Sequence, residues 1–216
     1  MTEAVPPRAL RPWRPFLLTG VAVLIAGACA FLWSEQTTVR AVISDKVGMY
    51  QVEQLAAPIC FAANESSVDA ELLAALVYME SRGQVDAKSS AGALGLMQLV
   101  PDAASDAATR LGIADAPTEE QLLSDGELNL RLGACHLAWL LEHRGDWTLE
   151  QVLVAYNAGR QKLFRWIRRA GSYEEWVRLE EQREAAGEGA TGALSYARKA
   201  LLVRERFLER QTIREE

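Results

Sequence analysis

Glu80 is the residue whose type and setting could do chemistry most directly. Leu72, Leu76 and Glu80 are spaced four residues apart, so a helix would place them on one face. A carboxyl group against an apolar face is costly to ionise, which raises its pKa and lets it act as a general acid near neutral pH. A glutamate that turns to solvent at the helix end fits the same spacing. The stripe alone leaves both interpretations open.

Two later segments carry residue types that a sugar ligand needs. Residues 91–98 (AGALGLMQ) hold two glycines, which indicates either a backbone that something approaches closely or a tight loop. Residues 155–159 (AYNAG) offer the ring and hydroxyl of Tyr156 and the donor and acceptor of Asn157. A core tyrosine and an asparagine near a helix end would explain the second segment equally well.

Helices must position these residues, because no strand-like alternation follows residue 33. Asp69 can cap a helix, and Thr118 and Thr148 each open a capping box. Residues 180–192 are rich in Glu, Ala and Gly and are predicted to form a mobile surface loop. The fold class is therefore all-α. The predicted helices cover residues 48–63 with a kink at Pro58, 70–82, 101–112, 126–143, 148–159, 160–170, 173–182 and 193–209.

The N-terminal region is predicted to be a membrane anchor. Residues 1–15 carry three arginines and form a cytoplasmic segment, and residues 16–33 are 18 residues without a charge, nearly enough to cross a bilayer core of roughly 30 Å. A stalk (34–47) and a catalytic domain (48–210) follow, exported to the periplasm from a single-pass inner-membrane helix. A cleaved signal peptide ending at Ala28-Cys29-Ala30, lipidation of Cys29 and a buried structural helix are the alternatives.

Composition argues against several classes of partner. The net charge is −6 and no basic block follows the N-terminus, so nucleic acid is not expected. Two histidines and three well-separated cysteines give no metal-binding cluster, so neither a metal nor another cofactor is expected. Export would permit a Cys60–Cys135 disulfide, but two small buried thiols are the favoured interpretation.

The ordered set of motifs resembles a known family. Its pattern is Glu-Ser, a serine nine residues after the glutamate, Gly-Ala-x-Gly-Leu-Met-Gln, a proline, Asn-x-x-x-Gly, Ala-Tyr-Asn-Ala-Gly and a closing tyrosine-bearing helix. Residues 50–205 follow it and so resemble the catalytic domain of the soluble-lytic-transglycosylase type, which is goose-lysozyme-like. The matching residues are Glu80-Ser81, Ser89, Gly92 to Gln98, Pro101, Asn129 to Gly133, Ala155 to Gly159 and Tyr196.

The resemblance implies a lysozyme-like helical domain with a cleft that binds peptidoglycan glycan strands. Glu80 would be the single acid/base that cleaves the β-1,4 bond between N-acetylmuramic acid and N-acetylglucosamine and leaves 1,6-anhydromuramoyl ends. The substrate-binding residues would be Ser89, Gln98, Tyr156 and Asn157, with Met97 packed beneath them. Trp139 and Trp166 are interpreted as core residues, with sugar stacking as the alternative.

Departures from the pattern keep other functions open. Gly83-Gln84-Val85, Ala103 and Gly192-Ala193 replace residues that are usual in the family. No second carboxylate has pattern support, since Asp86, Asp102 and Asp106 are near Glu80 only in sequence. The alternatives are a hydrolytic muramidase, a non-catalytic membrane-tethered peptidoglycan-binding protein and a helical adaptor of an envelope complex.

Overall fold

The structure is a computed structural model that describes residues 38–213 of the 216. The chain divides into two compact units, residues 1–46 and 47–216. The predicted anchor and the basic segment before it lie outside the described residues. Between residues 38 and 213 no helix is both long and apolar enough to cross a bilayer. The described part of the predicted stalk is helical, in a segment that covers residues 38–53.

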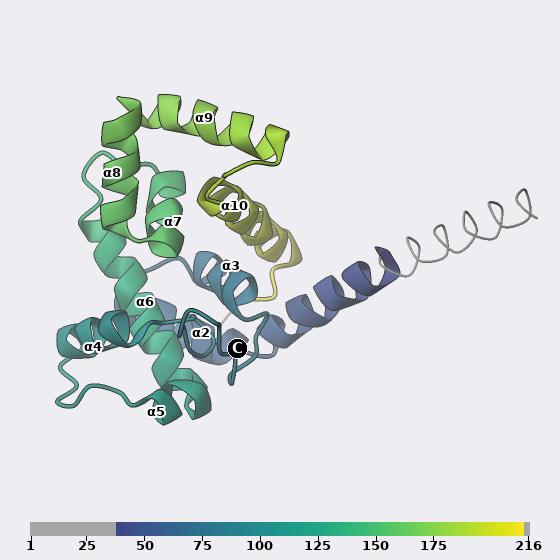
Figure 1. Ribbon diagram of the computed structural model, residues 1–216. Helices are drawn as coiled ribbons and strands as arrows, with labels where there is room; N and C mark the ends of the chain where they lie inside the picture. The colour runs from purple at the N-terminus through teal and green to yellow at the C-terminus, as the bar shows by residue number, and fades with distance from the viewer. Residues whose placement is uncertain (1–37, 214–216) are drawn as a thin grey trace, which may run out of the picture. The chain divides into compact units, whose positions relative to one another are not determined.

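The second unit is built from helices, most of them joined by short connections, with a long loop over residues 81–100 between α3 and α4 (Figure 1). The described residues contain no named strand, only isolated bridges of Leu94 with Lys88 and with Leu99, which confirms the all-α prediction. The helices are α2 (Ala56–Ser66), α3 (Ala70–Glu80), α4 (Pro101–Arg110), α5 (Glu119–Ser124), α6 (Gly126–Glu142), α7 (Leu149–Ala158), α8 (Arg160–Ala170), α9 (Tyr173–Ala186) and α10 (Ala193–Arg210).

The predicted helix starts are confirmed by side-chain caps. The Asp69 carboxylate accepts from the backbone N–H of Leu72 at 2.6 Å. Thr118 and Thr148 each form a complete capping box with the glutamine three residues later. Each cap satisfies backbone donors that the first helical turn leaves without a partner.

Two predicted boundaries were wrong. Residues 48–63 are not one kinked helix: the first helix ends at residue 53, and α2 begins at Ala56. Pro58 therefore lies in the first turn of α2, where its missing N–H needs no partner. The loop predicted for residues 180–192 was also wrong over its first half. Helix α9 continues to Ala186 because Trp176 and Glu180 are buried, and Gly187 ends it in the left-handed conformation.

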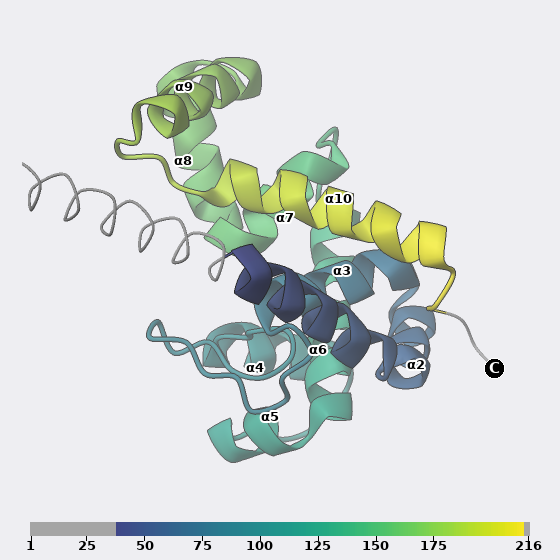
Figure 2. The same cartoon turned by 90° about the vertical axis from the view of Figure 1, so that its right-hand side faces the viewer.

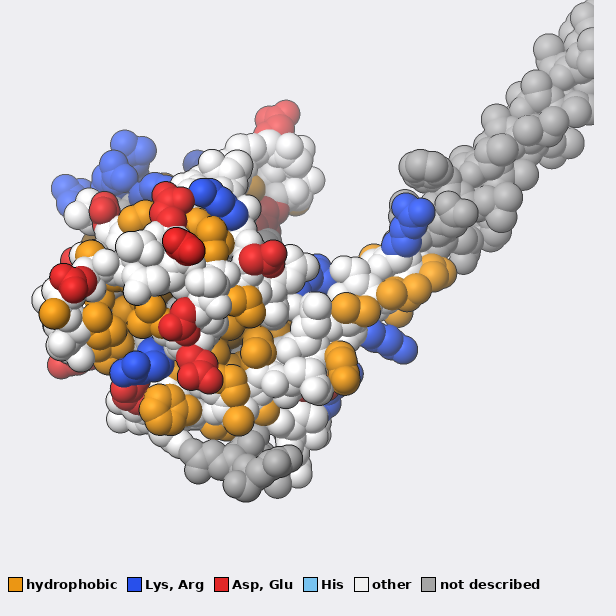
Figure 3. Space-filling model, turned by 90° about the horizontal axis from the view of Figure 1, so that it is seen from below, with side chains coloured by type: hydrophobic (Ala, Val, Ile, Leu, Met, Phe, Trp, Pro, Cys, Tyr) orange, Lys and Arg blue, Asp and Glu red, His pale blue; other side chains and the backbone are white. Residues whose placement is uncertain are grey.

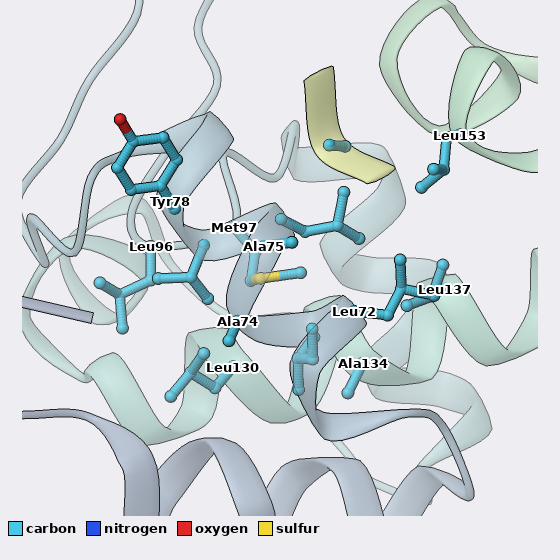
Figure 4. Packing of buried hydrophobic residues seen from close by; sticks show 14 of the residues in the cluster. Leu72, Ala74, Ala75, Tyr78, Leu96, Met97, Leu130, Ala134, Leu137 and Leu153 are labelled. Carbon is cyan, nitrogen blue, oxygen red and sulfur yellow. The ribbon is translucent and has the colours of Figure 1, made fainter. Parts of the chain in front are cut away.

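Helix α3 is the centre of the core. Every residue from Leu72 to Tyr78 is buried, so this helix is covered on all sides. Helices α10 and α2 pack against α3, and α7 packs against α10. Figure 2 shows α10 running across the domain, and Figure 4 shows Leu72, Ala75 and Tyr78 among the side chains of the surrounding elements.

Cys60 and Cys135 are both buried in the core and do not form a disulfide, as favoured from the sequence. The Trp166 and Trp176 rings stack at 5.5 Å between centroids and join α8 to α9. Over the face seen in Figure 3, acidic and basic side chains are interspersed with hydrophobic ones.

Candidate active site

A cleft of about 540 Å³ brings the sequence motifs together. Its walls come from the end of α3, the loop before α4, the C-terminal half of α6 and the junction of α7 with α8. The lining residues include Glu80 and all four predicted substrate-binding residues, Ser89, Gln98, Tyr156 and Asn157. Met97 is not among them: it is buried beneath the cleft, as predicted.

Glu80 ends α3 and lines the cleft. Its hydrogen-bond partner is the Tyr196 hydroxyl of α10, which donates to the carboxylate at 2.5 Å. Burial raises the pKa of Glu80 to about 7, although the hydrogen bond from Tyr196 lowers it. A carboxyl group with this pKa is present in both its protonated and its ionised form near neutral pH, so it can act as an acid and as a base.

Glu80 lies at the cleft, but not because of the apolar stripe, which left its orientation open. Because α3 is buried all round, Leu72 and Leu76 define no special face of it. Glu80 is half-buried because the helix ends there, at the edge of the cleft.

Two tyrosines face the acid from different helices. The Tyr156 hydroxyl of α7 donates to the backbone carbonyl of Met97 at 3.2 Å. Burial first, and then the Glu80 carboxylate, raise the pKa of both Tyr156 and Tyr196 well above the usual value. Both phenols therefore stay protonated, and Tyr196 acts as a donor to Glu80.

Ser89 and Gln98 shape the loop in which they lie. The Ser89 hydroxyl accepts from the backbone N–H of Ala93 at 3.0 Å. The Gln98 amide donates to the carbonyls of Ala87 and Gly95, both at 3.0 Å. Asn157, in contrast, is exposed at the cleft. Ser89 and Gln98 thus have structural contacts of their own in addition to their place on the wall.

Asn129 of α6 connects that helix to the loop that carries residues 91–98. Its fully buried amide accepts from Met97 N–H and donates to the carbonyls of Leu94 and Leu122. A β-carbon on Gly95 would lie 2.2 Å from the Asn129 amide nitrogen. The glycine is required so that the loop can approach α6 closely enough to make these bonds.

One end of the cleft is aromatic and cationic. His136 and Trp139 of α6 line it together with Arg160 of α8. Burial lowers the pKa of His136 to about 4, so its ring is neutral at physiological pH. The Trp139 ring contacts His143, and the guanidinium groups of Arg110 and Arg160 lie over it at 4.8 and 5.6 Å. Trp139 is thus at the cleft, whereas Trp166 is not among its lining residues.

Glu80 is the one carboxylate among the described lining residues; Asp86, Asp102 and Asp106 are not among them. The described part of the chain also holds no cluster of side chains that could ligate a metal. Of the departures from the family pattern, Ala103 lines the cleft, but residues 83–85 and 192–193 do not.

The sequence alone did not identify Tyr196 as a partner of the acid or His136 as part of the wall. Tyr196 had been noted only as a member of the closing helix. Its separation from Glu80 by 116 positions leaves no local signal of contact. The spacing of His136, Trp139 and His143 along α6 was the available signal for an aromatic face.

Comparison with known proteins shows the family of this chain. The model of the transglycosylase SLT domain family matches residues 57–179, and the chain belongs to this family. A relative is the membrane-bound lytic murein transglycosylase E of Buchnera aphidicola subsp. Acyrthosiphon pisum (strain APS), 31% identical over 112 residues. That alignment covers 50% of this chain and 51% of the relative, so this chain spans about half the length of the curated relative it matches.

Solved structures share the fold. The lytic transglycosylase Slt of Pseudomonas aeruginosa, in an inactive variant, aligns with a TM-score of 0.58 and 23% identity over 74% of this chain and 24% of its own. The 70 kDa soluble lytic transglycosylase SLT70 of Escherichia coli aligns with a TM-score of 0.58 and 21% identity, covering 71% of this chain and 24% of its own.

Proposed function

We propose that residues 48–210 form a lytic transglycosylase domain that cleaves peptidoglycan glycan strands with Glu80 as its single acid/base. The observation that carries the proposal is a cleft whose one described carboxylate has a pKa raised by burial to about 7. Ordinary glycosidases use two carboxyl groups that flank the scissile bond. A single group that serves twice needs a pKa near the working pH, because it must both give and take a proton.

The proposed reaction uses Glu80 in two steps. The protonated carboxyl donates to the oxygen of the β-1,4 bond between N-acetylmuramic acid and N-acetylglucosamine as that bond breaks. The resulting carboxylate then takes the proton of the C6 hydroxyl of the muramoyl sugar, whose oxygen bonds to C1. The product is a 1,6-anhydromuramoyl end, and no water is consumed. The Tyr196 hydroxyl supports both steps by holding the carboxylate in place between them.

Ser89, Gln98, Tyr156 and Asn157 are proposed to bind the glycan. Asn157 is the strongest candidate for a direct contact, because it is exposed on the wall. Ser89 and Gln98 contribute through the loop that they hold as well as through their free lone pairs.

The decisive experiment is product analysis on purified sacculi by mass spectrometry. The wild-type chain is expected to release 1,6-anhydromuropeptides, and Glu80→Gln is expected to release none while keeping its helical circular dichroism. Asp102→Asn, a matched carboxyl-to-amide change outside the cleft, serves as the control. Products one water heavier would identify a hydrolytic muramidase instead. Binding to sacculi without any soluble product would identify a non-catalytic binder.

We also propose that residues 16–33 anchor the chain in the inner membrane with the cleft in the periplasm. The charge-free run and the arginines before it support this topology. N-terminal sequencing of protein from the membrane fraction tests it, because a retained anchor leaves the original N-terminus. A start just after residue 30 would indicate a cleaved signal peptide, and a lipid on Cys29 would indicate a lipoprotein.

A further inference from the structure

Glu180 is a fully buried carboxylate outside the cleft. It lies in α9, and its oxygens accept three hydrogen bonds. One comes from the Arg183 guanidinium at 2.7 Å, and two come from Thr191, through its backbone N–H and its hydroxyl, both at 2.8 Å. A buried carboxylate is tolerated only with such partners, and its bonds are stronger than those between neutral groups.

Thr191 connects this carboxylate to the start of α10. The Thr191 hydroxyl that donates to Glu180 also accepts from the backbone N–H of Ala193, the first residue of α10, at 3.3 Å. The N-cap residue of α10 is Gly192, which has no side chain to cap the helix. The hydrogen bonds of Glu180 and Thr191 therefore stabilise the first turn of α10, which receives no side-chain cap from its N-cap residue.

Other polar contacts between α9 and α10 lie at the surface. The Ser195 hydroxyl donates to Glu184 at 2.6 Å, and Arg198 donates to Glu181 at 2.8 Å. Exposed pairs of this kind contribute little to stability or geometry. Glu180, in contrast, is shielded from water. Figure 1 shows the connection from the end of α9 to the start of α10 that it secures.

Tyr196 closes the same turn of α10. Its backbone N–H donates to the carbonyl of Gly192 at 2.9 Å, and its hydroxyl donates to Glu80 at 2.5 Å. We propose that Glu180 is a positioning residue for the reaction: by holding Thr191 it fixes the first turn of α10, and with it the Tyr196 hydroxyl against the Glu80 carboxyl. The inference rests on the proposed role of Glu80 and adds a residue in another helix that sets its geometry.

The test compares Glu180→Gln with Glu175→Gln in the full-length chain in mild detergent. Glu175 is the matched control, because it is on the same helix and its side chain binds Arg178 of that helix rather than α10. Two readouts are needed: the pH dependence of kcat/KM on glycan strands, and the pKa of Glu80 measured from its carboxyl ¹³C chemical shift.

Glu180→Gln is expected to lower kcat/KM by about tenfold, less than the roughly hundredfold loss that a catalytic group misplaced by 1 Å can cause. It should also raise the measured pKa of Glu80, because the hydrogen bond from Tyr196 lowers that pKa and would be weakened. Glu175→Gln should change neither readout. A Glu180→Gln variant that folds and keeps the wild-type pKa of Glu80 would overturn the proposal.

A double-mutant cycle with Tyr196→Phe separates positioning from general structural support. If Glu180 acts through Tyr196, Glu180→Gln shifts the pKa of Glu80 in the wild-type background and adds no shift once Tyr196 is phenylalanine. An equal shift in both backgrounds contradicts the proposal. If Glu180→Gln does not fold, Thr191→Val decides, because it removes the hydroxyl and keeps the backbone donor. Thr191→Val should raise the pKa of Glu80, by a smaller amount than loss of the Glu180 carboxylate would. An unchanged pKa of Glu80 would overturn the proposal.

The chemical-shift titration does not require turnover, so the two proposals can fail separately. A wild-type chain that releases no product from sacculi would contradict the proposed function. The titration of Glu80 in the Glu180 and Thr191 variants would still show whether Glu180 controls that carboxyl.

Discussion

Gly133 of α6 lies directly against the side chain of Met97. A β-carbon at Gly133 would be 2.4 Å from the Cγ atom of Met97 and 2.9 Å from its Cε atom. The loop that forms one wall of the cleft therefore rests on the bare backbone of α6. This contact and the hydrogen bond from the Met97 N–H to Asn129 fix the position of Met97, and of the adjacent Gln98, relative to α6.

Gly133→Ala is expected to destabilise the fold by about 1–2 kcal/mol, because overpacking outweighs the better helix propensity of alanine. Urea denaturation followed by circular dichroism measures this change. In a Met97→Ala background Gly133→Ala should cost less, since the Cγ and Cε atoms that it meets are gone and only the β-carbon at 2.6 Å remains. A Gly133→Ala variant as stable as the wild type would contradict the close packing.

Asn129→Ala is expected to lower the free energy of unfolding by about 3 kcal/mol, because it leaves a buried N–H and two buried carbonyls without a side-chain partner. Asn157→Ala is the matched control, since its side chain is exposed and should change stability by less than about 0.5 kcal/mol. Equal losses in the two variants would contradict the role assigned to Asn129. Denaturation curves at pH 7 give both values.

The activity should fall as the pH rises through about 7. In the proposed reaction Glu80 must be protonated to donate to the glycosidic oxygen, and burial raises its pKa from 4.5 to about 7. The value of kcat/KM should then drop by about tenfold per pH unit on the alkaline side. Tyr196→Phe should move this alkaline limb of the pH profile to higher pH, because the hydrogen bond that it removes favours the ionised form of Glu80. A limb that moves the other way in Tyr196→Phe would contradict the assignment.

Glu80→Gln should make the folded domain more stable at alkaline pH. The folded state holds the Glu80 proton up to about pH 7, whereas the unfolded chain releases it near 4.5. The unfolded state binds fewer protons between these values, so wild-type stability decreases as the pH rises through that window. The loss amounts to about 3 kcal/mol above pH 7.

Denaturation midpoints at several pH values measure this gain. Glutamine does not ionise and escapes the penalty, so the variant should exceed the wild type at pH 8 and approach it below pH 4.5. A variant that is less stable than the wild type at pH 8 would show that the carboxylate is not desolvated.

The helices could be predicted from the sequence because caps are local signals, and motif spacing indicated that Glu80 would lie at the cleft. Asp69, Thr118 and Thr148 marked three helix starts at the correct residue. The pairing of Glu80 with Tyr196 could not be predicted in this way, since periodicity within a helix does not say which helices meet.

Glu180 is the clearest limit of the sequence analysis. It lies in an acidic segment whose composition is typical of a solvated loop, and its burial depends on donors supplied by Thr191 and Arg183. The fate of residues 16–33 remains a prediction, because they lie outside the described residues.

The order of α3 and α10 along the chain has a consequence for biosynthesis. Glu80 ends α3, whereas the phenol that binds it belongs to α10, the last helix among the described residues. Synthesis therefore adds Glu80 to the chain 116 residues before Tyr196. The hydrogen bond that positions the proposed acid can therefore form only after the start of α10 has been synthesised.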